Sequence, residues 1–213
     1  MIKNTEAHKL YLEGYEAFEQ GDFRSAKALA DTCLTLSSHT SYWHAGALGL
    51  KCWVANFTNN LTELEKTAET LMSIDTGTDK PWFDGVALLN LGLVKRKDGQ
   101  SSEARTFFLR ASERYKAQEL QPGQPGEWEN VIDYFSTLCR WAAVEETNEW
   151  RNLLKRFRDD TSKQSKLLRQ LSAAAQIMLR YSEGEEVKRE TIELVKESVS
   201  RTFLSVLLLE YAE

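Results

Sequence analysis

Apolar residues recur every three or four positions along almost the whole 213-residue chain, and no segment alternates long enough to indicate a β-strand. Only three prolines and eleven glycines interrupt this pattern, so long helices can form with few breaks. The sequence therefore predicts an all-α fold of about ten helices. Their predicted ranges are 5–20, 23–36, 41–57, 61–74, 82–97, 101–119, 128–145, 148–158, 163–181 and 185–211.

Turn residues mark the ends of these helices. Gly21 is expected to close the first helix, and Asp22 is a good N-cap for the second. Pro81 stands near the first position of the fifth helix, where its missing N–H is tolerated. Ser101 or Ser102 is expected to cap the sixth. Because the connections are short, neighbouring helices should be antiparallel and form stacked hairpins.

The strongest break is the segment LQPGQPGE at 120–127, which holds two of the three prolines. It predicts two parts, 1–119 and 128–213, which we expect to be continuous with each other. The charged N-terminus predicts no signal peptide, and the longest apolar run, 203–209, is too short to cross a bilayer. Cys33, Cys52 and Cys139 are expected to be small core residues in a reducing cytoplasm.

Two segments of the first part, 10–26 and 88–104, match each other. Each has a leucine four residues before a glycine, a second glycine seven residues after the first, and an alanine five residues later. These positions are Gly14, Gly21 and Ala26 in one segment and Gly92, Gly99 and Ala104 in the other. The first glycine allows two helices to approach closely, the second suits a left-handed helix end, and the alanine faces the contact.

A degenerate copy lies between the two. Leu48-Gly49 and Asn56 occupy its glycine positions, and Leu64, Ala68 and Leu71 follow after about three extra residues. Over residues 5–119 this pattern resembles the tetratricopeptide repeat, whereas the chain beyond 127 shows no such motif. The resemblance implies a right-handed α-α superhelix whose first helices line a concave groove that binds another protein or a peptide.

Carried over to this sequence, the groove positions are largely aromatic and apolar. They are Tyr11, Tyr15, Trp43, Trp53, Leu89, Leu93 and Arg96, with His8, Phe18, Leu50 and Val86 beside them. Such a groove suits an apolar helix or an extended peptide. The alternative is that these side chains form the core, which is the commoner place for aromatic residues at helical spacing. The family's clamp for C-terminal carboxylates is not retained, because Tyr11 and Tyr15 replace its Lys and Asn.

A second candidate site is basic. The stretch 150–170 holds seven Lys and Arg against two Asp, in a chain of net charge −5. It could meet an acidic protein or an anionic surface, or it could be a solvated helix face. The residues singled out are Arg151, Lys155, Arg158 and Lys166. The acidic net charge argues against general nucleic-acid binding.

The last predicted helix, 185–211, carries an apolar stripe that broadens until its end is apolar all round. The stripe residues are Ile192, Val195, Val199, Phe203 and Val206. Such a helix is buried either in its own chain or in a homodimer.

The sequence lacks the common catalytic signatures: it has no Gly-rich phosphate loop, GxSxG or HExxH motif. His39 and His44 lie five residues apart without an acid or cysteine to complete a metal set. We therefore expect no enzyme, cofactor or metal. The leading hypothesis is a protein-interaction scaffold, and the alternative is a sensor whose helices bind a small ligand or peptide.

The C-terminal helix generates the first testable prediction. Deleting the chain from Glu185 onward should lower the melting temperature or convert a dimer to a monomer, because the deletion removes the apolar stripe and exposes the surface that it covers. Thermal melting and light scattering measure the two effects. An unchanged melting curve and an unchanged mass would contradict both interpretations of this helix.

Overall fold

The computed structural model describes residues 2–120, 127–143, 151–152, 155–156 and 166–197. Within these ranges the regular structure is entirely helical, as the hydrophobic period predicts. The chain divides into two compact units, 1–122 and 123–213. Each is described by itself.

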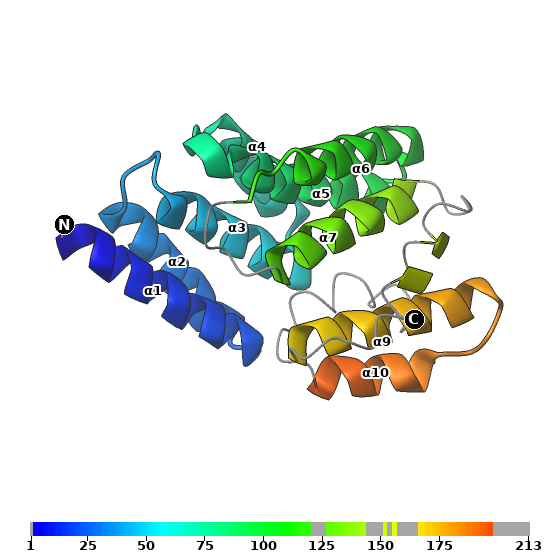
Figure 1. Cartoon of the computed structure of the whole chain (residues 1–213). Helices are drawn as coiled ribbons and strands as arrows, with labels where there is room; N and C mark the ends of the chain where they lie inside the picture. Colours follow the sequence, from blue (N-terminus) through cyan, green and yellow to red (C-terminus); the bar gives the residue numbers. More distant parts are fainter. Residues whose placement is uncertain (1, 121–126, 144–150, 153–154, 157–165, 198–213) are drawn as a thin grey trace. The chain divides into compact units, whose positions relative to one another are not determined.

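The first unit contains six α-helices (Figure 1). They are α1 (Ile2–Glu19), α2 (Phe23–Leu36), α3 (Tyr42–Phe57), α4 (Leu61–Ser73), α5 (Lys80–Lys97) and α6 (Ser101–Lys116), with a 3₁₀ turn, η1 (Gly77–Asp79), before α5. The predicted ranges for these helices are confirmed to within three residues at each end. Two capping predictions also hold: the Asp22 carboxylate accepts from the Ser25 N–H, and Pro81 stands in the first turn of α5.

The six helices pack as three hairpins. Each odd-numbered helix contacts the helix that follows it, so that α1 pairs with α2, α3 with α4 and α5 with α6. In addition α1 contacts α3, and α3 contacts α5, so these three helices lie side by side in one layer (Figure 1). The second helix of one hairpin also packs against the first helix of the next.

The turn of each hairpin contains one residue in the left-handed conformation. Gly21 and Gly99 have φ values of 81° and 75°, which confirms the predicted helix ends. In the middle hairpin the left-handed residue is Asn59, with φ of 53°. This turn lies between the predicted helix ranges 41–57 and 61–74, as expected, but the repeat alignment that put Asn56 at the second glycine position is wrong. Asn56 is still helical, and Asn59 accepts the left-handed conformation because asparagine tolerates it better than most residues.

When the repeats are aligned on their left-handed residues, the middle hairpin at Asn59 is in register with the other two. The residue seven before Asn59 is Cys52, a fully buried small side chain where the other hairpins have glycine. The core positions of the second helices then coincide without extra residues. They are Ala26, Ala30 and Cys33 in α2, Leu64, Ala68 and Leu71 in α4, and Ala104, Phe108 and Ala111 in α6, all buried.

The sixth helix begins differently from its prediction. Its N-cap is Gln100, whose side chain makes no capping hydrogen bond, and Ser101 is already helical. Two long polar side chains hold the connection between α4 and α5 and the start of α5. Lys80 Nζ donates to the carbonyls of Met72 and Ile74 at 3.0 Å each, and Gln118 Oε1 accepts the backbone N–H of Trp82 at 3.0 Å.

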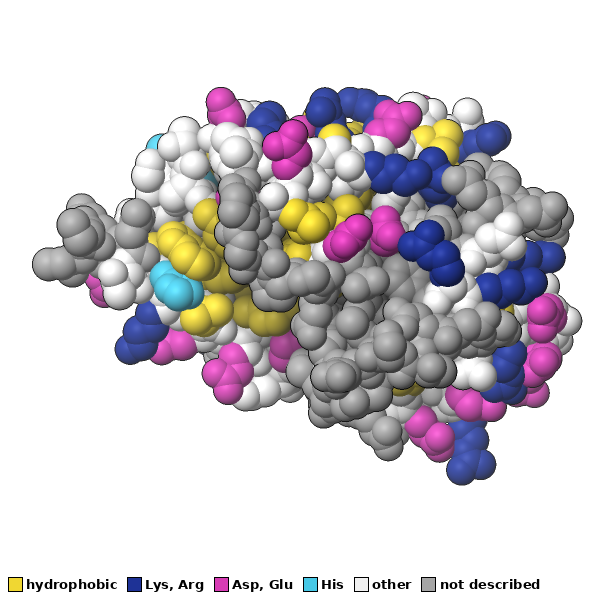
Figure 2. Space-filling view, viewed as in Figure 1, with side chains coloured by type: hydrophobic (Ala, Val, Ile, Leu, Met, Phe, Trp, Pro, Cys, Tyr) yellow, Lys and Arg dark blue, Asp and Glu magenta, His cyan; other side chains and the backbone are white. Residues whose placement is uncertain are grey.

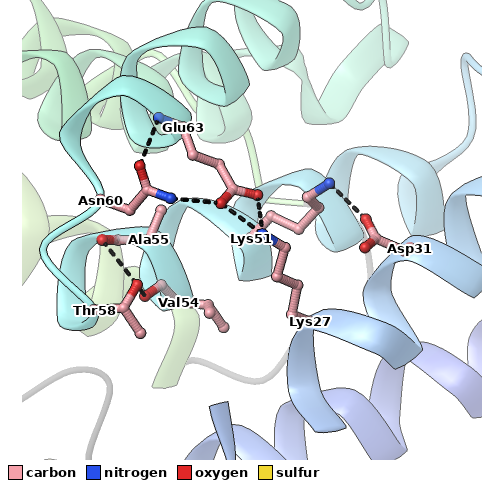
Figure 3. Close-up of polar contacts among 8 residues, drawn as sticks. All are labelled: Lys27, Asp31, Lys51, Val54, Ala55, Thr58, Asn60 and Glu63. Carbon is pink, nitrogen blue, oxygen red and sulfur yellow. Dashed lines mark hydrogen bonds and ion pairs between the residues drawn. The ribbon is translucent and has the colours of Figure 1, made fainter. Parts of the chain in front are cut away.

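Ion pairs link successive hairpins at the surface (Figure 3). Lys27 of α2 meets Glu63 of α4 at 2.6 Å, and Lys51 of α3 meets Asp31 of α2 at 2.5 Å. Glu63 also accepts from the side chain of Asn60, the N-cap of α4, at 3.0 Å. Such exposed pairs contribute roughly 0–1 kcal/mol each, so burial of the helix faces supplies most of the stability.

The second unit contains α7 (Glu127–Ala143), α9 (Lys166–Ser182) and α10 (Lys188–Glu197). The predicted break at 182–184 is confirmed, since Gly184 is left-handed there with φ of 85°. Arg180 holds this turn by donating to Glu185 at 2.6 Å and to Glu190 at 3.3 Å. Most of the predicted helix 148–158, and the predicted helix 185–211 beyond 197, lie outside the described residues.

The described part of the chain contains no helix long and apolar enough to cross a membrane. All three cysteines are buried as free thiols, which confirms the prediction that they are small core residues.

The glycines of the helices give a matched test of close packing. A Cβ on Gly92 would lie 2.5 Å from Cε1 of Phe108, a fully buried ring, whereas a Cβ on Gly49 would meet nothing closer than Val86 Cγ1 at 3.8 Å. We expect Gly92→Ala to lower the free energy of unfolding by about 1–3 kcal/mol. Gly49→Ala should raise it by roughly 0.5–1 kcal/mol, because alanine has the higher helix propensity.

Denaturant unfolding measures both free energies. Equal effects of the two variants would show that α5 and α6 do not approach as closely as the structure places them.

Candidate functional site

Two helices, α3 and α5, which begin the second and third hairpins, are buried on all sides over most of their length. In α3 every residue from His44 to Asn56 except Lys51 is buried, and in α5 every residue from Phe83 to Val94 is buried. The predicted groove residues on these stretches therefore belong to the interior. Trp53 is 9% exposed, Leu89 1% and Leu93 8%. For these three side chains the core interpretation is the one that the structure supports.

Arg96 does not join the other predicted groove residues. Its guanidinium carbon lies 4.7 Å from the centre of the Phe108 ring of α6, a distance at which a cation–π interaction is favourable. Arg96 therefore covers the Phe108 ring, which fits against α5 only because Gly92 has no side chain.

The structure does bring together the aromatic residues of α1 and the start of α3. Trp43 stacks on His8 with ring centres 4.0 Å apart and planes 18° apart. Tyr11 lies 5.8 Å from Trp43 and 6.3 Å from Tyr15. All four rings are partly exposed. Tyr11 thus meets the first predicted groove residue on α3, and Tyr15 meets Tyr11.

A glycine on α3 allows this contact. A Cβ on Gly46 would lie 2.9 Å from Cε2 of Tyr11, so only glycine leaves room for the ring. Burial, followed by the nearby Tyr42 and Tyr15, raises the pKa of Tyr11 above its ordinary value. The Tyr11 hydroxyl therefore stays protonated and can donate a hydrogen bond at any pH near neutrality.

Leu12 completes this surface, and sequence reasoning missed it. It is the most exposed large apolar side chain in the described part of the chain, at 52%. It stands four residues after His8 and three before Tyr15, so the three share one side of α1. Figure 2 shows hydrophobic side chains and a histidine together on the side of the molecule where Figure 1 places α1. We call His8, Tyr11, Leu12, Tyr15 and Trp43 the aromatic face.

The predicted basic site is only partly described. Arg151 is partly exposed and Lys155 is exposed, while Arg158 and the side chain of Lys166 lie outside the described residues. The neighbouring Arg156 pairs with Asp133 at 3.3 Å. The basic site therefore stays a prediction.

The apolar stripe of the predicted helix 185–211 is described only at its beginning. Ile192 is 38% exposed, and the side chains from Val195 onward lie outside the described residues. Among the residues that the structure does describe, no three His, Cys, Asp or Glu side chains are placed to hold a metal ion together.

Comparison with known proteins adds no identity to this geometry. The chain matches no protein-family model, no curated protein and no solved structure. The function is therefore argued from the chain's own residues.

Alanine substitution separates the interior residues from the aromatic face. Because Trp53 is buried, Trp53→Ala should lower the free energy of unfolding by about 3–5 kcal/mol. Tyr15→Ala removes a partly exposed ring and should cost about 1 kcal/mol. Denaturant titrations followed by circular dichroism measure both values, and a larger loss for Tyr15→Ala would reverse the assignment of core and surface.

Proposed function

We propose that this chain is a protein-interaction module that holds a peptide or a helix of its partner on the aromatic face. The observation that carries the proposal is the exposure of Leu12 among four partly exposed rings at the junction of α1 and α3. Tyrosine and tryptophan anchors of this kind dominate the binding energy of many protein interfaces. An apolar side chain of the partner would bury Leu12 and the exposed edges of the rings.

The arrangement of hairpins supports the same proposal. The three turns at Gly21, Asn59 and Gly99, and the contacts among α1, α3 and α5, fit a tetratricopeptide-like solenoid. In such an array the first helices present one continuous surface to a ligand. In this proposal the binding surface is confined to α1 and the start of α3, because the rest of α3 and most of α5 are buried.

The exposure of Leu12 differs from that of the other exposed residues of α1. The exposed residues that follow a different side of α1 are charged or polar: Lys9, Glu13, Glu16 and Gln20. A polar outer edge is typical of a helix that ends a repeat array. Leu12 lies on the other exposed side, with His8 and Tyr15, where a partner would cover it.

A small-ligand sensor is the alternative, and one buried group favours it. Asn90 is fully buried in α5, and its Nδ2 donates to the Val86 carbonyl at 2.8 Å. Its Oδ1 has no hydrogen-bond partner within the described part of the chain. Buried amide oxygens are nearly always paired, so a ligand that donates a hydrogen bond would satisfy this one. The three buried thiols support a reducing compartment such as the cytoplasm for either function.

Site-specific photo-crosslinking tests the proposal. A photoreactive phenylalanine analogue at Leu12 should form one discrete adduct with another protein in cells that express this chain. The same analogue at Leu109 of α6, which is also an exposed leucine at 37%, should form none. A synthetic peptide of the crosslinked segment should then bind the purified chain, and Leu12→Asp should weaken that binding at least about tenfold.

Equal adducts from the two positions would contradict the proposal. Adducts of the chain with itself would replace it with self-association. A purified chain that binds no such peptide, but is stabilised by a small molecule only while Asn90 is present, would establish the sensor.

A further inference from the structure

The three histidines of the chain gather at the first turn of α3. The chain has no others. His44 is the third residue of α3, His8 of α1 stacks on its neighbour Trp43, and His39 meets the His44 ring edge-on with centres 4.7 Å apart. This turn is the junction where the first hairpin joins the second.

His44 connects the end of α2 to the start of α3. It is 6% exposed, and its Nδ1 lies 3.0 Å from the Ser37 hydroxyl oxygen. That hydroxyl donates its single hydrogen to the Cys33 carbonyl at 2.7 Å, so its oxygen accepts from Nδ1–H of His44. The backbone N–H of His44 donates to Ser41 Oγ at 3.2 Å. The bond to Ser37 places a proton on Nδ1 of the imidazole.

The surroundings of His44 do not accommodate a positive charge. Its contacts are the hydroxyls of Ser37 and Ser41 and the ring of His39, and the N-terminus of α3 carries partial positive charge. No hydrogen bond or ion pair joins a carboxylate to His44 in the described ranges. Asp79, from the connection between α4 and α5, acts on Tyr42 instead.

The other titratable groups at this junction stay neutral. The Cys33 thiol of α2 donates to the carbonyls of Ala7 at 3.3 Å and Trp43 at 3.6 Å. Burial raises the pKa of Cys33, and it raises the pKa of Tyr11 on α1. Neither group can therefore supply a negative charge that would balance a protonated His44.

Burial, and then the nearby His39, lower the pKa of His44 below its ordinary value. The folded chain thus binds this proton less tightly than the unfolded chain does. The stability that neutral His44 contributes is present above the ordinary histidine pKa of about 6.5, and it is lost as the pH falls below that value.

We propose that the buried His44, in contact with the His39 ring, makes the junction between α2 and α3 acid-sensitive, so that mild acidification releases the first hairpin from α3. Protonation of His44 would place a buried positive charge against the His39 ring and the N-terminus of α3, where no carboxylate is bonded to it in the described ranges. The proposal is independent of the proposed function. It bears on the aromatic face because that face is formed by α1 and the start of α3, which this release would separate.

Hydrogen exchange measured by mass spectrometry tests this switch. The full chain is compared at pH 7.5 and pH 5.5 after correction for the intrinsic effect of pH on exchange. We expect protection of residues 37–46 and of α1 to fall by several-fold, up to about tenfold, at pH 5.5, while α5 and α6 change little. No fall, or an equal fall along the whole chain, would overturn the proposal.

Two variants assign the effect to its residues. His44→Asn keeps a donor near the position of Nδ1 but cannot be protonated, so its response to pH should be lost. His8→Gln, which removes the third histidine, should keep the response. Should His44→Asn fail to fold, an NMR titration of the native histidines decides: a pKa of His44 at or above about 6.5 would overturn the proposal.

Discussion

The residue that ends each first helix determines how residues 2–116 pack. At Gly21, Asn59 and Gly99 the backbone enters the left-handed region, and the residue that follows returns an N–H to a carbonyl five positions earlier. That same residue is the N-cap of the next helix. The chain therefore reverses within the three residues that separate the paired helices, and the turn has the same hydrogen bond in each hairpin. The apolar positions five, nine and twelve residues later consequently face the first helix in all three hairpins.

Close helix pairing decides which side chains remain for contact with a partner. Because α3 contacts α1, α2, α4 and α5, Trp53 in its middle is buried. The first turn of α3 is the exception, and there Trp43 meets the rings of α1. The Tyr11 ring of the aromatic face needs the space that Gly46 leaves. The same turn contains His44, so the packing of the junction and the proposed response to acid involve neighbouring residues.

Most of the fold of the first unit could be predicted from the sequence, because glycine has few other reasons to recur at such spacing. Gly21 and Gly99 were placed correctly for this reason. The middle turn was also placed between the correct helices, but the repeat alignment took Asn56 for the second glycine position, because Asn56 and Asn59 are both asparagines and only packing distinguishes them. The candidate site was harder. Trp43 and Trp53 look alike in sequence, and only the position of neighbouring helices separates a partly exposed ring from a buried one. The contact between His39 and His44 crosses a turn whose geometry no residue pattern specifies.

The pairing of Gly92 with Phe108 has a consequence for how this sequence can change. The ring occupies the volume that any side chain at 92 would need, and Arg96 covers the ring from another side. A larger residue at 92 becomes acceptable only when 108 shrinks at the same time, and a smaller residue at 108 leaves a void unless 92 grows. The side chains at positions 92 and 108 are therefore constrained jointly. Among related chains, substitutions at 92 and 108 should occur together, with the combined volume of the two side chains nearly constant.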